Sequence, residues 1–133
     1  MSMHHEAKLK SANKELLALG NLAAIQDVFI DDYVVHAGDQ DHGGHEFIAR
    51  FVTQLRNSIP DLEVTDLVIL NENGDTITWQ RTLSGTHRFA LKGIRASGQR
   101  VQWRDMMVSR FAGDKIAEEW TVSGLAGEFF AKL

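Results

Sequence analysis

The sequence predicts an α+β fold in which a strongly curved antiparallel sheet wraps around helices. Two observations predict it. Apolar residues recur at helical spacing before Pro60, and they alternate with polar residues after it. Turn signals such as the Asn73-Gly74 pair then join the alternating segments as hairpins, whose strands are antiparallel. Helices followed by strands favour the α+β class over parallel α/β crossovers.

Three helical stretches precede Pro60. The first is predicted over residues 6–19 and ends at Gly20, and the second is a short helix over residues 22–29. A brief extended segment, 31–36, and a polar loop, 37–44, come next. The third helix ends before Pro60, because the residue before a proline avoids the helical region. Its apolar stripe consists of Phe47, Ile48, Phe51, Val52 and Leu55.

At least four strands are predicted after Pro60, and a short helix closes the chain. Gly85 lies inside the second of these strands and predicts a bulge or bend, which would help the sheet to curl around a helix. A pocket between sheet and helices would result. We expect the strands at residues 62–70, 77–84, 101–111 and 116–122, and the helix at 125–133.

The composition limits the class of protein. A chain of 133 residues suffices for one domain, which we expect to span residues 1–133. The net charge of -4 disfavours binding to a phosphate backbone, so we expect no nucleic-acid partner. The absence of cysteine excludes disulfides and thiolate chemistry and is compatible with a reducing cytoplasm. No apolar run approaches the roughly 20 residues of a membrane span, so we expect a cytoplasmic protein.

Strand alternation decides which charged side chains face the interior. In the strand 77–84 the apolar face carries Arg81 beside Trp79, and in the strand 101–111 it carries Asp105 beside Trp103. A charge on an apolar face is unfavourable unless it is paired. We therefore expect Arg81 and Asp105 to meet inside the fold.

The last strand is predicted to point Glu118 and Trp120 inward, together with Ile116 and Val122. Its other face, with Ala117 and Thr121, would also tolerate burial. Burial raises the pKa of a carboxyl group and a nearby Arg lowers it, and such opposed effects produce a general acid or base near neutral pH. The alternative is a plain ion pair that joins two strands without any chemistry.

Several segments of the chain resemble the SnoaL-like polyketide cyclases of the nuclear-transport-factor-2-like superfamily. The resemblance covers about residues 21–133, and the order and spacing of its pieces are specific together. The pieces are Asp31-Asp32-Tyr33-Val34-Val35-His36, residues 44–51, Ser58-Ile59-Pro60-Asp61-Leu62, Leu83-Ser84-Gly85-Thr86-His87, Gly98-Gln99-Arg100-Val101 and residues 113–120.

The resemblance implies an α+β cone with a deep cavity for a small molecule, usually in a homodimer. It also implies ring closure by acid/base chemistry without metal or cofactor. His36 and His87 match positions that border the cavity, where His36 would orient a carbonyl or shuttle a proton. The family further implies an acidic residue directly after Trp120, whereas this chain continues Thr-Val-Ser-Gly over residues 121–124.

The sequence therefore predicts a cyclase, isomerase or hydrolase that uses cofactor-free acid/base chemistry on a small hydrophobic carbonyl- or ester-containing molecule. The alternative is a non-catalytic module of the same fold for small-molecule binding or dimerisation. The predicted catalytic residues are Asp105, Arg81, His36 and Glu118. The predicted pocket residues are Trp79, Trp103, Trp120, His87, Met107, Phe51 and Tyr33. We expect no metal, because the spacing of His36, Asp39, Asp41, His42 and His45 matches no strong metal motif.

Overall fold

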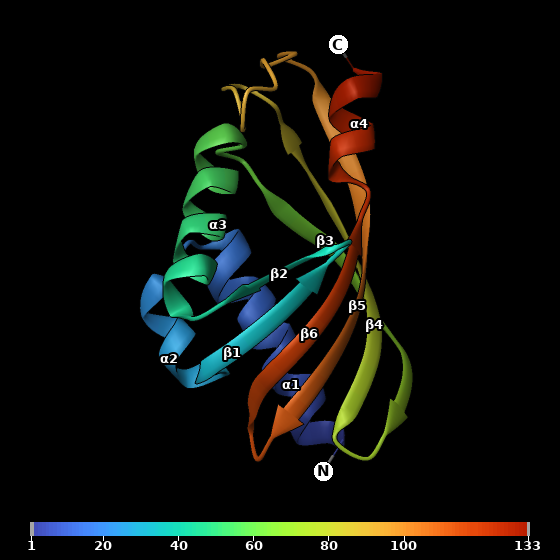
Figure 1. Ribbon diagram of the computed structural model, residues 1–133. Coiled ribbons are helices and arrows are strands. Elements are labelled where there is room, and N and C mark those ends of the chain that lie inside the picture. Colours follow the sequence, from blue (N-terminus) through green and yellow to red (C-terminus); the bar gives the residue numbers. More distant parts are fainter. Residues whose placement is uncertain (1, 133) are drawn as a thin grey trace.

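A six-stranded, strongly curved and unclosed sheet forms one wall of the molecule, and helices cover its concave side (Figure 1). The computed structural model describes residues 2–132. The predicted α+β cone is confirmed. In chain order the elements are α1 (Ser2–Ala12), η1 (Asn13–Ala18), η2 (Leu22–Ala24), α2 (Ile25–Val28), β1 (Phe29–Ala37), β2 (Gln40–Gly43), α3 (His45–Ser58), β3 (Glu63–Asn73), β4 (Thr76–Thr86), β5 (Arg100–Ala112), β6 (Lys115–Ser123) and α4 (Leu125–Ala131).

The sheet has the strand order β2-β1-β6-β5-β4-β3. Its pairs are antiparallel except for β1 with β6, which are parallel. The four predicted strands are β3 to β6, which lie side by side in the sheet, with β5 and β6 at its centre. β1 is the predicted extended segment, continued in both directions.

Strand β2 corrects the prediction of a plain polar loop over residues 37–44. Residues Gln40–Gly43 pair with β1 across a tight turn that contains Gly38, whose φ of 64° is in the left-handed region that glycine adopts easily. The side chains of β2 are polar and mostly exposed, so alternation gives no signal for a strand. An edge strand of this kind is held by its backbone hydrogen bonds.

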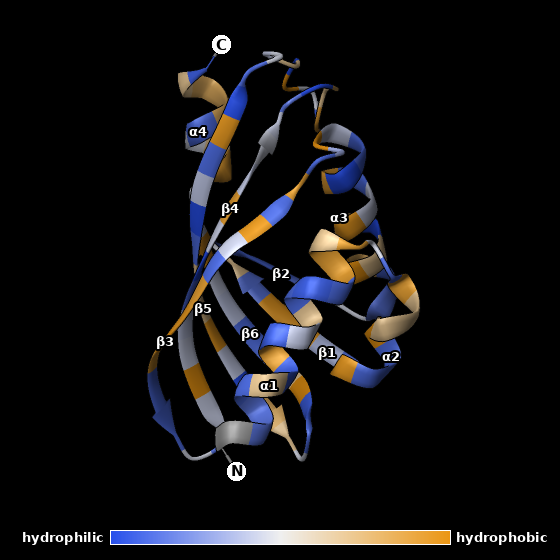
Figure 2. Cartoon of the chain, turned by 180° about the vertical axis from the view of Figure 1, so that it is seen from behind, coloured by the Kyte–Doolittle hydropathy of each residue, from blue (hydrophilic) through white to orange (hydrophobic). Residues whose placement is uncertain are grey.

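The concave side of the sheet and the helices share one hydrophobic core. Helix α3 buries Ile48, Val52 and Leu55 from its apolar stripe, while α1 and η1 contribute Leu9 and Leu16. Figure 2 shows hydrophobic segments interspersed with hydrophilic ones along these helices and strands, as expected for elements with one buried face. Within the described residues, no helix has the length and hydrophobicity that a membrane crossing requires.

Strand β6 contains a bulge that reverses its predicted orientation. Phe111 of β5 pairs with Ile116, but the preceding Arg110 pairs with Glu118, so Ala117 is an extra residue. Ile116 and Ala117 are both buried, and beyond them Glu119 faces inward. The prediction that Glu118, Trp120 and Val122 point inward is therefore wrong: Trp120 is 41% exposed and Val122 is 73% exposed.

Gly85 is required where the chain after α3 crosses β4. A side-chain Cβ at this position would collide with Cγ2 of Ile59 and lie 3.4 Å from Cα of Leu62. Replacing Gly85 by Ala should therefore lower the free energy of unfolding by about 1–3 kcal/mol, the usual cost of overpacking a core. Urea denaturation measures this change.

The matched control is Gly127→Ala in α4, where an added Cβ meets nothing within 4 Å. Because alanine favours a helix over glycine by about 1 kcal/mol, this variant should be neutral or more stable. Equal stability of the two variants would contradict the proposed close approach at Gly85.

Candidate functional site

A cavity of about 270 Å³ lies between the concave face of the sheet and the helices. Most of its wall is apolar and comes from α1, η1, α3, β1 and the inner faces of β4, β5 and β6. Five residues predicted for the pocket line this cavity, and they are Tyr33, Phe51, Trp79, Trp103 and Met107. The wall also contains polar side chains, several of which form two hydrogen-bonded groups.

The first polar group is built around Arg81 and Asp105. These residues are cross-strand partners on β4 and β5, and Nε of Arg81 donates to Oδ2 of Asp105 at 2.9 Å. Nη1 of Arg81 donates to Oδ1 of Asn13 at 2.9 Å, and Asn13 Nδ2 donates to the carbonyl of Leu9 at 2.8 Å. The side chains of Arg81 and Asp105 are only 11% and 5% exposed. The predicted meeting of these two charges inside the fold is thus observed, with Asn13 as a third member.

One oxygen of Asp105 is left without a partner. Oδ1 is buried, and no described residue donates a hydrogen bond to it. A buried, unsatisfied carboxylate oxygen is unfavourable by about 1–3 kcal/mol or more, so such groups are rare in folded proteins. Asp105 is among the residues that line the cavity, so this covered oxygen is a candidate acceptor for a proton or hydroxyl group of a bound molecule.

The second polar group is centred on Glu119, which is fully enclosed. The hydroxyl of Tyr33 donates to Oε1 of Glu119 at 2.7 Å, and the hydroxyl of Ser109 donates to Oε2. Nε1 of Trp79 donates to Ser109 Oγ at 2.8 Å. Burial raises the pKa of Glu119 above its ordinary value, against the opposite effect of its two hydroxyl donors. Burial likewise raises the pKa of Tyr33, with the nearby Glu119 carboxylate adding to it.

Sequence reasoning missed Asn13 and Glu119. Asn13 occupies a buried position four residues after Leu9, so its place within the apolar stripe of the first helix was a usable signal. For Glu119 the signal was the pair Ile116-Ala117 directly after the tight turn. Two consecutive apolar residues interrupt the alternation and are compatible with a bulge, which shifts every later side chain to the other face.

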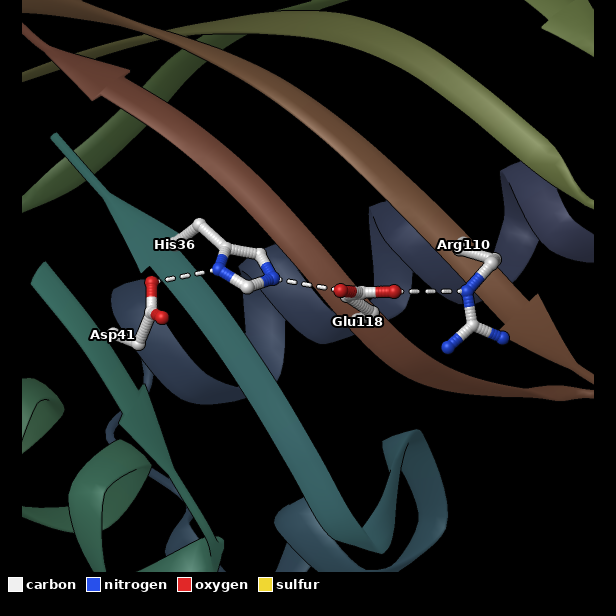
Figure 3. A network of polar contacts seen from close by, with 4 residues as sticks. All are labelled: His36, Asp41, Arg110 and Glu118. Atoms are coloured by element: carbon white, nitrogen blue, oxygen red, sulfur yellow. Dashed lines mark hydrogen bonds and ion pairs between the residues drawn. The ribbon is translucent and has the colours of Figure 1, made fainter. Parts of the chain in front are cut away.

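His36, Glu118 and Trp120 lie outside the cavity, on the outer face of the sheet. There Nε2 of His36 lies 2.6 Å from Oε2 of Glu118, and its Nδ1 lies 2.7 Å from Oδ1 of Asp41 (Figure 3). Nε of Arg110 donates to Oε1 of Glu118 at 3.1 Å, and the ring of Trp120 stacks on His36. This outer-face network spans β2, β1, β6 and β5, and its charges neutralise one another.

The outer-face network raises the pKa of one member and lowers the pKa of another. The hydrogen bond to Glu118, followed by that to Asp41, raises the pKa of His36 above 6.5. The hydrogen bond from His36, followed by that from Arg110, lowers the pKa of Glu118 below 4.5. Both shifts favour the charged forms, so the network is a chain of ion pairs between about pH 4.5 and 6.5.

His87, the remaining predicted pocket residue, is fully buried and does not line the cavity. Its ring stacks on Phe129 of α4 with centroids 3.8 Å apart, and neither ring nitrogen has a hydrogen-bond partner among the described residues. Burial lowers its pKa. His87 therefore packs as a neutral aromatic residue under α4.

The His- and Asp-rich stretch before α3 is divided among separate contacts. Asp41 belongs to the outer-face network, while His42 stacks on Phe47. Nε2 of His45 donates to the carbonyls of Phe29 and Ile30 at 3.1 and 3.0 Å. These side chains thus serve to fasten β1, β2 and α3 together.

Comparisons with known proteins agree with this architecture. A family model described as SnoaL-like polyketide cyclase matches residues 7–129. A candidate polyketide cyclase from Acidithiobacillus ferrooxidans has a TM-score of 0.82 and 22% identity, over 96% of this chain and 93% of that chain. AclR of Streptomyces galilaeus, a candidate hydroxylase, has a TM-score of 0.78 and 22% identity, over 96% and 94%.

A third solved structure is IdmH of Streptomyces antibioticus, a candidate polyketide cyclase, with a TM-score of 0.75 and 21% identity over 96% of both chains. At such identities these structures show a shared fold. None of the curated proteins matches the chain in sequence.

The buried state of Glu119 predicts a specific pH dependence of stability. The pKa of Glu119 is higher in the folded state than in the unfolded state, where it is about 4.5. Its contribution to stability is therefore fully present below about pH 4.5 and is lost as the pH rises through the pKa of the folded state. Glu119→Gln cannot ionise, so it should gain stability relative to the original protein as the pH rises from 4 to 8. Urea denaturation at both pH values tests this, and a constant difference would contradict it.

The outer-face network predicts a different dependence for Glu118→Gln. The raised pKa of His36 stabilises the fold below about 6.5, and the lowered pKa of Glu118 does so above about 4.5. The variant should therefore lose most stability between about pH 4.5 and 6.5, and the loss should shrink once His36 is neutral. A loss that keeps growing toward pH 10 in thermal denaturation would exclude this ion pair.

Proposed function

Because the chain belongs to the SnoaL-like polyketide cyclase family, we propose that it is a cofactor-independent enzyme that cyclises or isomerises a small, largely apolar carbonyl compound inside the cone. The chemistry would begin with the removal of a proton from a carbon next to the carbonyl. The apolar cavity would exclude water and hold the body of the substrate by its hydrophobic surface.

The single observation that carries this proposal is the hydrogen bonding of the Asp105 carboxylate, in which one oxygen has a partner and the other has none among the described residues. Its Oδ2 is held by Arg81, which stabilises negative charge on the carboxylate and fixes its orientation, and its Oδ1 is unpartnered. A base must be positioned and its charge stabilised, and the pairing of Asp105 with Arg81 provides both; because Oδ1 is covered, the bound substrate would have to bring its reacting carbon to this oxygen. Arg81 acts through Asp105, and Asn13 in turn holds the guanidinium in place.

Glu119 supports a division of roles between two carboxyl groups. It pairs across the sheet with Ser109, four residues from Asp105, so the backbone positions of the two residues are roughly 13 Å apart along the strand direction at about 3.3 Å per residue. Burial raises its pKa and so eases the uptake of a proton, and Glu119 in that form would donate to a developing oxyanion. One carboxyl group would then accept a proton at one end of the cavity, and the other would donate one further in.

The second candidate function is binding without catalysis, and one observation favours it. Thr121 lies in the cavity wall, and no acidic residue stands among residues 121–124. In this case Arg81 and Asp105 would only connect β4, β5 and η1, and the cavity would hold a hydrophobic ligand.

We also propose a homodimer that is formed through the outer face of the sheet. This face exposes the large apolar side chains of Met106, Trp120 and Val122 on neighbouring strands. An exposed apolar patch of this kind is typical of a contact with another protein. The outer-face network would then lie at the rim or centre of that contact.

The proposal predicts that Asp105→Asn removes proton abstraction. The amide side chain can still accept the hydrogen bond from Arg81, but it is not a base. We expect the enzyme-catalysed exchange of α-hydrogens of 2-decanone for deuterium in D₂O to fall by about 100-fold or more. Proton NMR of the ketone measures this exchange.

Glu118→Gln is the matched control, since it alters a carboxylate on the outer face and should leave the exchange rate unchanged. Exchange that survives intact in Asp105→Asn would overturn the role of Asp105 as the base. Ketone binding, detected by tryptophan fluorescence, with no exchange in any variant would favour the non-catalytic alternative.

A further inference from the structure

The connection between β4 and β5 is strongly basic in an acidic protein. From His87 to Arg100 the chain contains Arg88, Lys92, Arg95 and Arg100 but no Asp or Glu, while the whole chain has a net charge of -4. Figure 1 places this connection at one end of the cone, above the end of α3 and beside α4. We call residues 87–99 the basic loop.

The basic loop is fastened to its neighbours through its backbone. The amides of Arg88 and Phe89 donate to the carbonyl of Ser58, the last residue of α3, at 3.0 and 3.2 Å, and the Ser58 hydroxyl donates to the carbonyl of Phe89. Gln99 Nε2 donates to the carbonyl of Lys132, just beyond α4. The loop therefore holds a defined position at the end of the cavity.

Lys92 is in an unfavourable backbone conformation at the tip of this loop. Leu91 and Ile94 exchange two backbone hydrogen bonds of 2.9 Å, and Lys92 and Gly93 form the two-residue turn between them. Their φ angles are 48° and 82°, so both residues are left-handed, as in a type I′ turn that normally contains Asn-Gly or Gly-Gly. A lysine here is disfavoured by roughly 1–2 kcal/mol, and residues in such conformations cluster at ligand-binding sites.

Lys92 is an exposed residue in the lining of the cavity, and it forms no ion pair with any described residue. The other cation in the wall, Arg81, is already bonded to Asp105 and Asn13. Because Asp105 neutralises Arg81, the deeper part of the cavity offers an anion no free cation among the described residues. The remaining titratable side chains in the wall are Tyr33, which donates to Glu119, and His42 on β2, which is stacked on Phe47.

We propose that Lys92 is the specificity residue for an anionic group of the substrate, a carboxylate or a phosphate monoester, that stays at the basic loop while the apolar body enters the cavity. The inference rests on the proposed function of the cavity and adds the chemical class of its ligand. Arg88 and Arg95 would raise the local concentration of anions by long-range attraction. The Lys92 ammonium would make the direct contact.

The test compares three probes that share one alkyl chain: decanoate, decyl phosphate and decan-1-ol. Their binding, below their micelle concentrations, is measured by the fluorescence of Trp79 and Trp103 and by calorimetry. The original protein should bind at least one of the two anions about fivefold to tenfold more tightly than the alcohol, consistent with one charge-assisted hydrogen bond. The preferred anion distinguishes a carboxylate site from a phosphate site, and the preference should weaken in 0.5 M NaCl.

Lys92→Asn removes the charge but tolerates the left-handed turn, so the variant should be at least as stable as the original protein. We expect it to lose the preference for the anion while its affinity for decan-1-ol stays within about twofold, whereas Lys92→Arg keeps the preference. Arg95→Asn is the matched control, because it removes a charge from the same loop without touching the cavity wall, and it should keep most of the preference.

Equal affinities for the anions and the alcohol in the original protein would overturn the role of Lys92 while leaving the cavity as an apolar site. A preference that persists in Lys92→Asn would also overturn it. No binding of any probe in any variant would instead contradict the proposed function of the cavity itself, and with it this inference.

Discussion

The ion pair between Arg81 and Asp105 is the interaction on which both the fold and the site depend. Two charges this deeply enclosed cost several kcal/mol each in lost hydration, and only direct pairing offsets this cost. The guanidinium bonds to β5 through Asp105 and to η1 through Asn13, so it ties the sheet to the helix that covers it. The arrangement satisfies Arg81 more completely than Asp105, whose Oδ1 remains unpartnered. Stability alone does not account for that oxygen, whereas a bound substrate would.

Strand β6 shows how one backbone irregularity divides two neighbouring carboxyl groups. Glu118 and Glu119 are adjacent in sequence, but the bulge at Ala117 leaves the first on the outer face and the second inside. His36 and Arg110 lower the pKa of Glu118, and burial raises the pKa of Glu119. The single extra residue in β6 therefore determines which carboxyl group is an ion-pair partner and which is a candidate acid.

Sequence reasoning succeeded where a pattern was long and uninterrupted. Eleven paired positions run between β4 and β5 without a register shift, so alternation placed Trp79, Arg81, Trp103 and Asp105 on one face. It failed in β6, because a bulge breaks the alternation that the argument assumes, and in β2, because an exposed edge strand needs no apolar face. The apolar stripe of the first helix signals the burial of Asn13 but not its partner. Its role comes from a contact across 68 positions of sequence, which no local pattern encodes.

The most direct measurement of the central claim is a crystal structure of the protein grown with a long-chain methyl ketone. The account predicts that the ketone chain lies against Trp79 and Trp103, and that its carbonyl end lies beside Arg81 and the free oxygen of Asp105. A cavity closed by side chains, with Oδ1 of Asp105 accepting a hydrogen bond from the protein itself, would contradict it.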